Sequence, residues 1–135
     1  MEAQVAFEFL VITGIVLAFL TPIWIYASSL QTRSSDQLDI SLAQNAASKL
    51  TNTADLVASQ GMPAQAMLDV YMPAQVANVS IIASTIDIKV NTFTGVVDAV
   101  SSSNSQLNGS LPAAQGSYQV LVQAKNGYVQ IGLAS

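Results

Sequence analysis

The chain has 135 residues, enough for one domain plus an extension, and 51% of them are hydrophobic while 9% are charged. Its net charge is −4, and the scarcity of basic residues argues against nucleic-acid binding, which needs clustered cations to neutralise phosphates. The sequence has no cysteine and no histidine, which excludes disulfides, thiol nucleophiles, Cys/His zinc sites and imidazole acid–base chemistry. We therefore expect no enzyme activity, no metal and no organic cofactor.

The first predicted element is an apolar helix near the N-terminus. From Phe9 to Ala27 the sequence contains no charged residue. As a helix this run is roughly 28 Å long, close to the hydrocarbon thickness of about 30 Å. Trp24 and Tyr26 stand at its end, where amphipathic aromatic residues prefer a membrane interface. The run predicts a membrane-compatible helix, and Pro22, which removes one helical hydrogen bond, predicts a kink in it.

The polar stretch that follows continues the helical pattern. Its apolar residues recur at near-helical spacing and form a stripe on one side. The stripe comprises Leu30, Leu38, Leu42, Ala43, Ala46, Ala47, Leu50, Ala54 and Val57. Gly61 and Pro63 then favour a helix stop. We predict one helix from Gln4 to Gln60, roughly 85 Å long, although the Ser/Thr-rich segment 28–35 favours a break as an alternative.

Beyond Pro63 the pattern changes to strands. The stretches VANVSIIAS, TIDIKVN and TGVVDAVS are rich in β-branched residues and predict three strands, whereas AMLDVYMP fits either a helical turn or a short strand. The stretch SSSNSQLNGSLPAAQGS is a predicted polar loop with glycine and proline punctuation. The last stretch, YQVLVQAKNGYVQIGLA, predicts a hairpin closed by Asn126-Gly127, which is a type I′ turn signal.

These elements together predict an α+β fold. A long N-terminal hydrophobic and amphipathic helix is followed by a small antiparallel β-rich domain over residues 61–135. A domain of this size buries too little surface for an independent core, so we expect it to pack on the helix or on neighbouring copies.

Glu8 stands at the start of the apolar run, between Phe7 and Phe9, with no basic residue before it. In one interpretation it marks the edge of a membrane span, with its carboxylate extended toward the headgroups. In a second interpretation several such helices pack together in a bundle. A carboxylate inside that bundle favours pairing with the α-amine of a neighbouring copy whose chain begins at Gln4. Glu8 would then set the axial register between copies.

The string AQVAFEFLVITG resembles the class III signal peptide of archaeal type IV pilin-like proteins. These proteins carry a glutamine at the first mature position and a glutamate four residues later, ahead of an apolar run. The resemblance implies that a membrane prepilin peptidase cleaves between Ala3 and Gln4, which makes residues 1–3 a residual leader. It also implies insertion in the cell membrane before assembly, and then extraction by an assembly ATPase with a membrane platform protein.

The same resemblance implies a type IV pilin-like fold and a structural role. Copies of the chain would polymerise into a helical filament on the cell surface, a pilus used for adhesion. The helix of residues 4–60 would form the filament core through its apolar half, residues 9–27, while the β domain faces outward.

Two other classes of protein fit parts of the pattern. A membrane-tethered extracytoplasmic binding domain that stays monomeric would use the apolar helix as a permanent anchor. The stripe from Leu38 to Val57 favours assembly over this alternative, because a lone tether needs no apolar face there. A conventionally secreted soluble protein would instead be cleaved after Ala27.

The remaining candidate sites lie in the predicted β domain. Asn78 and Asn108 head N-glycosylation sequons and are candidate carriers of N-linked glycans, and Asn108 is the better candidate because it lies in a predicted loop. Asp87 and Asp98 could share a cation, but without EF-hand spacing they fit solvated strand-face residues better. The Ser101–Ser103 run has no accompanying base and predicts a flexible loop without a nucleophile.

Overall fold

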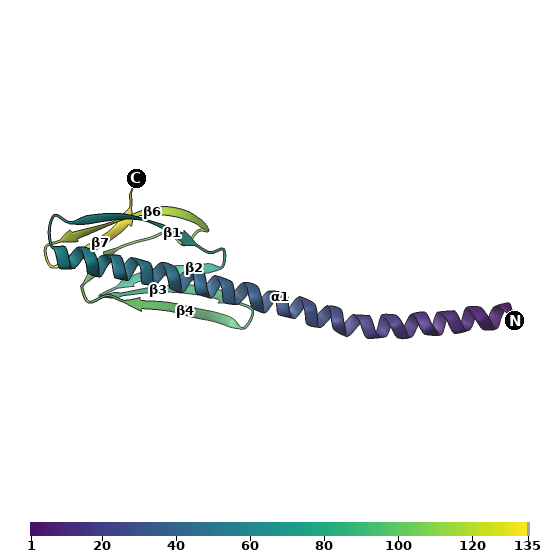
Figure 1. Cartoon of the computed structure of the whole chain (residues 1–135). Coiled ribbons are helices and arrows are strands. Elements are labelled where there is room, and N and C mark those ends of the chain that lie inside the picture. The colour runs from purple at the N-terminus through teal and green to yellow at the C-terminus, as the bar shows by residue number, and fades with distance from the viewer. Residues whose placement is uncertain (135) are drawn as a thin grey trace. The chain divides into compact units, whose positions relative to one another are not determined.

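The computed structural model describes residues 1–134. Over these residues the chain forms one helix followed by seven strands (Figure 1). The elements are α1 (Glu2–Gln60), β1 (Gln65–Met72), β2 (Val76–Ile82), β3 (Thr85–Thr92), β4 (Gly95–Ser102), β5 (Leu107–Gly109), β6 (Gly116–Lys125) and β7 (Tyr128–Leu133). The predicted α+β fold class, with a long apolar N-terminal helix before a β-rich part, is confirmed.

The chain divides into two compact units, and the division falls inside α1. The N-terminal unit is Met1–Ser35, and the second unit, which we call the helix–sheet unit, starts at Asp36. We expected the β domain to be residues 61–135, whereas the helix–sheet unit also contains the last turns of α1. The strands and this part of the helix therefore fold together.

The helix α1 is unbroken across the segment 28–35, so the expected alternative break is absent there. The Ser29 hydroxyl donates to the carbonyl of Ile25 at 3.4 Å, and the Thr32 hydroxyl donates to the carbonyl of Ser28 at 3.2 Å. These hydroxyls bond back to the preceding turn, so they do not cap a new helix. Pro22 also lies inside α1 and does not end it, while the kink at Pro22 stays a prediction.

The strands of the helix–sheet unit form two sheets. The larger sheet has the order β1-β6-β7-β5, and the smaller sheet has the order β2-β3-β4. Neighbouring strands are antiparallel except β5 and β7, which are parallel. The ambiguous stretch AMLDVYMP is strand β1, whose inward residues Val70 and Met72 are buried.

Strand β5 contradicts the prediction of a loop between Ser101 and Ser117. It is short, but Leu107 is buried and anchors it in the core. The Leu107 N–H donates to the carbonyl of Ala83 at 2.7 Å, and the Val129 N–H donates to the carbonyl of Gln106 at 2.8 Å. One buried leucine among polar residues shows no strand periodicity, so long-range contacts decide the structure of this stretch.

A single hydrophobic core joins α1 to both sheets. The helix contributes Ala43, Ala46, Ala47, Leu50, Ala54 and Val57, and the strands contribute mainly β-branched residues from β3, β6 and β7. Side-chain bonds confirm contact with each sheet: Gln44 donates to the carbonyl of Val100 in β4, and Lys49 donates to the carbonyl of Asp69 in β1. Figure 1 shows the teal part of α1 running beside the strands.

The chain's own sheets therefore cover the predicted apolar stripe from Ala43 to Val57. Leu30 and Leu38 lie outside this cover, since they remain 49% and 60% exposed. The stripe from Leu38 to Val57 therefore does not favour assembly over a lone tether, because the chain's own sheets cover most of it.

The Asn126-Gly127 hairpin turn is present, but its predicted type is wrong. Lys125 pairs with Tyr128 across the turn, and Gly127 has a φ of +88°. A type I′ turn needs positive φ at both central residues. Ala83 is the only non-glycine residue with positive φ in the described chain, so Asn126 does not meet this requirement.

Candidate functional site

The exposed apolar surface of the N-terminal unit is the main functional candidate. Every residue from Met1 to Ser35 is exposed, and the first helical residue that packs against the core is Ile40. We call residues 5–30 the apolar helix. Its largest exposed side chains include Phe7, Phe9, Leu10, Phe19, Ile23, Trp24 and Tyr26.

These side chains surround the apolar helix and do not form one stripe. A helix that is apolar on all sides is stable when lipid or other apolar helices cover it. By length and composition α1 can cross a membrane. The apolar helix therefore needs a cover that the rest of the chain does not supply.

The two threonine hydroxyls of the apolar helix are satisfied by its own backbone. The Thr13 hydroxyl donates to the carbonyl of Phe9 at 2.8 Å, and the Thr21 hydroxyl donates to the carbonyl of Leu17 at 2.9 Å. Both hydroxyls can therefore enter an apolar environment without an unpaired donor.

Glu8 is the only charged residue between Val5 and Leu30 in the sequence. It is exposed, and the ion pairs within residues 1–134 all involve Lys89, so Glu8 has no ionic partner among these residues. Helical spacing places Gln4 one turn before Glu8 on the same face. Ala3 and Gln4, the predicted processing residues, lie in the first turn of α1 and are exposed.

The two sequons lie on strands of different sheets. Asn78 lies in β2 beside a register shift, is exposed, and donates from Nδ2 to the Ser80 hydroxyl at 3.3 Å. Asn108 is also exposed, but it lies in β5 opposite Gln130, so its placement in a loop is wrong. The exposure of both amides is compatible with glycan attachment, which stays a prediction.

Asp87 and Asp98 share a lysine between them. The Lys89 ammonium donates to Asp98 Oδ1 at 3.0 Å and lies 3.4 Å from Asp87 Oδ2. The hydrogen bond to Asp98, followed by the charge of Asp87, raises the pKa of Lys89 above its usual value. Lys89 already provides the positive charge that these carboxylates attract, so the arrangement gives no reason to add a cation.

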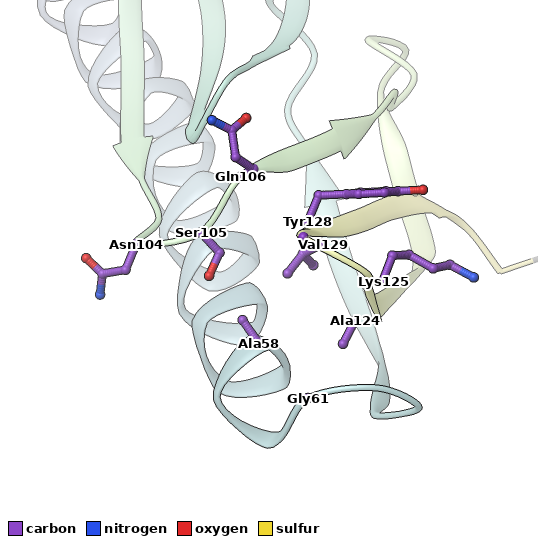
Figure 2. Close-up of a pocket in the computed structure, with 10 residues that line it drawn as sticks. Ala58, Gly61, Asn104, Ser105, Gln106, Ala124, Lys125, Tyr128 and Val129 are labelled. Carbon is purple, nitrogen blue, oxygen red and sulfur yellow. The ribbon is translucent and has the colours of Figure 1, made fainter.

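The sequence does not predict a groove of about 390 Å³ that lies at the end of α1. Its lining comes from the helix end (Ala58, Gly61), the segment 104–106 and the β6–β7 turn region. Figure 2 shows the Asn104 and Lys125 side chains pointing away from the space beside Ala58. No carboxylate lines this groove, and its residues do not combine an acid, a base and a nucleophile.

Comparison with protein-family models, with curated proteins and with solved structures found no match to this chain. What the chain shows is a long apolar N-terminal helix followed by a small β-sheet part, a layout compatible with a pilin-like fold. Two features of this layout call for a partner outside the chain's own fold: the apolar helix has no cover, and Glu8 has no ionic partner among the described residues.

Proposed function

We propose that this chain is a structural subunit of an archaeal type IV-like surface pilus, polymerised through its N-terminal apolar helix and serving adhesion. The observation that carries the proposal is the complete exposure of residues 1–35, none of which contributes to the chain's own core. Apolar helices from several copies can cover one another on all sides. Transfer from membrane to filament core then costs little, because one apolar environment replaces another.

Glu8 supports assembly of a processed chain. The chain's four basic residues, Arg33, Lys49, Lys89 and Lys125, all follow the apolar helix. Cleavage after Ala3 would place the new α-amine at Gln4, four residues before Glu8 and closer along the sequence than any basic side chain. In a filament core, pairing of this amine with the Glu8 carboxylate of a neighbouring copy avoids an uncompensated buried charge.

The remaining parts follow from this arrangement. The helix–sheet unit has its own core and faces outward, where it contacts the adhesion target and carries glycans at Asn78 and Asn108. Before assembly the apolar helix lies in the cell membrane. A prepilin peptidase, an assembly ATPase and a membrane platform protein serve the transition from membrane to filament.

A monomeric membrane tether is the second candidate. It is favoured by the packing of the sheets on Ala43–Val57, because this part of α1 needs no neighbouring copy to cover it. The apolar helix alone would then remain to be covered, and lipid can cover it. The tether and the subunit differ in what lies around residues 5–30 and in whether the chain is processed.

The test is the N-terminus and state of the native chain. Filaments are sheared from cells, imaged by electron microscopy, and their subunit is analysed by intact mass spectrometry. A filament subunit that begins at Gln4 supports the proposal. A membrane-bound monomer that retains Met1 supports the tether, and a soluble chain that begins at Ser28 indicates ordinary secretion.

A further inference from the structure

Phe93 lies at the tip of the β3–β4 hairpin and is 83% exposed. Its backbone N–H donates to Asp36 Oδ2 at 2.9 Å. Asp36 lies in α1 shortly after Leu30, where the apolar helix ends. Within the helix–sheet unit, the hairpin tip is thus fixed to the turn of α1 that comes first along the chain.

The phenylalanine ring has no role in forming this turn. Hairpin tips are normally built from glycine, asparagine, aspartate and proline. Here the Thr92 hydroxyl donates to the carbonyl of Gly95 at 2.7 Å, and Gly95 has a φ of +134°. These two residues supply the turn chemistry, so the exposed ring is available for a contact outside the unit. Val96, which follows the turn, is also 57% exposed.

We propose that Phe93 is a second assembly contact, whose ring packs on the apolar helix of a neighbouring copy. This inference rests on the proposed function and names a partner surface for it. In a helical filament each interface joins two different surfaces of the same chain. An exposed aromatic ring and an apolar helix form such a pair, because both lose unfavourable contact with water when they meet.

The position of Asp36 selects the apolar helix as the partner surface. In a filament, every copy's helix–sheet unit begins just beyond its own apolar helix, so the end of the unit at Asp36 is the end nearest to the packed helices. The other end of β3 is the turn at Ala83-Ser84, which lies farther along the unit. Phe93 is at the end that neighbouring apolar helices can reach.

The first experiment compares two exposed apolar residues at opposite ends of the smaller sheet. Phe93→Ala removes the ring at the Asp36 end, and Ile82→Ala removes a side chain that is 70% exposed at the opposite end. Circular dichroism should show both full-length variants folded in detergent. Recovery of sheared filaments should fall roughly tenfold or more for Phe93→Ala, the factor expected when a buried phenylalanine contact is lost, and stay near wild type for Ile82→Ala. Phe93→Leu, which keeps an apolar side chain, should restore much of the recovery.

The second experiment identifies what touches the ring. A photo-reactive residue, Phe93→p-benzoylphenylalanine, is irradiated in assembled filaments, and the products are mapped by mass spectrometry. A cross-link to residues 5–30 of another copy supports the inference. Wild-type filaments with normal recovery of Phe93→Ala, or cross-links only to other surfaces, overturn it while leaving the proposed function intact. If the wild-type chain forms no filaments and the probe reacts with lipid, both proposals fail and the tether is supported.

Discussion

At the scale of single residues, a substitution of Glu8 distinguishes most directly between a filament subunit and a membrane anchor. Glu8→Gln keeps the shape of the side chain and removes its charge. In a filament core this leaves a neighbouring α-amine unpaired, a change that costs about 3–5 kcal/mol in buried sites. We expect at least a roughly tenfold loss of filament recovery with an unchanged circular dichroism spectrum.

The matched control for Glu8 is Glu2→Gln, on the same exposed helix. The proposed processing after Ala3 removes Glu2, so its change should not affect filaments once processing is complete. Normal filament recovery from Glu8→Gln would contradict the pairing of Glu8 and leave it as the edge of an apolar segment.

The ion pairs of Lys89 stabilise the folded chain, and this stabilisation is lost at alkaline pH. The Asp98 and Asp87 carboxylates raise its pKa in the folded state, so the folded chain holds this proton more tightly than the unfolded chain. The resulting stabilisation is fully present below the unfolded pKa of about 10.4 and is lost as pH rises through the higher folded value.

Melting curves of wild type and Lys89→Met in detergent, from pH 7 to pH 11.5, measure this term. The difference in Tm should be constant up to roughly pH 10 and then shrink. In an Asp98→Asn background the difference should be smaller at every pH, because the strongest partner of Lys89 is weakened. A difference that stays constant through the whole range would contradict the assignment.

Ala83 occupies a backbone conformation that suits glycine. Its φ is +53°, and left-handed conformations are strained in residues with a Cβ. Ala83→Gly should raise the free energy of unfolding by about 0.5–1 kcal/mol, since relief of this strain exceeds the added chain entropy. Ala77→Gly in β2, where φ is not positive, is the control and should destabilise the chain. Denaturant titration of both variants measures the sign of each change in the free energy of unfolding.

At the scale of elements, the close contact between α1 and the sheets depends on small residues. Ala43 and Ala47 are fully buried, so no space remains for larger side chains there. Ala47→Leu should lower the free energy of unfolding by about 1–3 kcal/mol through overpacking. Asn45→Leu, on an exposed position of the same helical turn, should change it much less. Equal effects of the two variants in denaturant titrations would mean that the sheets do not press on this face.

Strands with a clear local pattern could be predicted from the sequence. In β3 the β-branched residues Ile86, Ile88 and Val90 alternate with polar ones. Strands β2 and β4 are rich in β-branched residues, and Asn126-Gly127 marks the turn between β6 and β7. Strand β1 was ambiguous because Ala66, Met67 and Leu68 suit a helix as well as a strand. Strand β5 had no local signal, since its pairing depends on β7 far along the chain.

The candidate site divides in the same way. The apolar helix and Glu8 are visible in the sequence because their character depends on consecutive residues. The exposure of Phe93 beside Asp36 depends on a hydrogen bond between residues 57 positions apart, and the groove at the end of α1 combines several separate segments. The apolar periodicity of α1 also could not show which part of the stripe is covered. The position of the sheets decides this, and it leaves Leu38 exposed.

At the scale of the whole molecule, the stability of the helix–sheet unit should be independent of the N-terminal unit. All the buried residues of α1 lie between Ala43 and Val57. The side-chain bonds between α1 and the rest of the helix–sheet unit involve helix residues from Asp36 onward. Asp36 accepts from the Phe93 N–H, and Gln44 donates to the carbonyl of Val100. Asp55 accepts from the Ser103 hydroxyl and the Asn104 N–H. Removal of residues 1–35 therefore deletes no buried side chain and none of these bonds.

A fragment that begins at Asp36 should fold as a monomer without detergent. We expect a cooperative thermal transition at nearly the Tm of the full chain in detergent, and a monomeric mass in sedimentation, because the exposed apolar helix is gone. A fragment that begins at Ser48 is the control: it lacks Ala43, Ala46 and Ala47 and should not unfold cooperatively. If the Asp36 fragment were also unfolded, residues 1–35 would contribute to the fold itself. Their exposure could then no longer be explained by a requirement for lipid or for other copies of the chain.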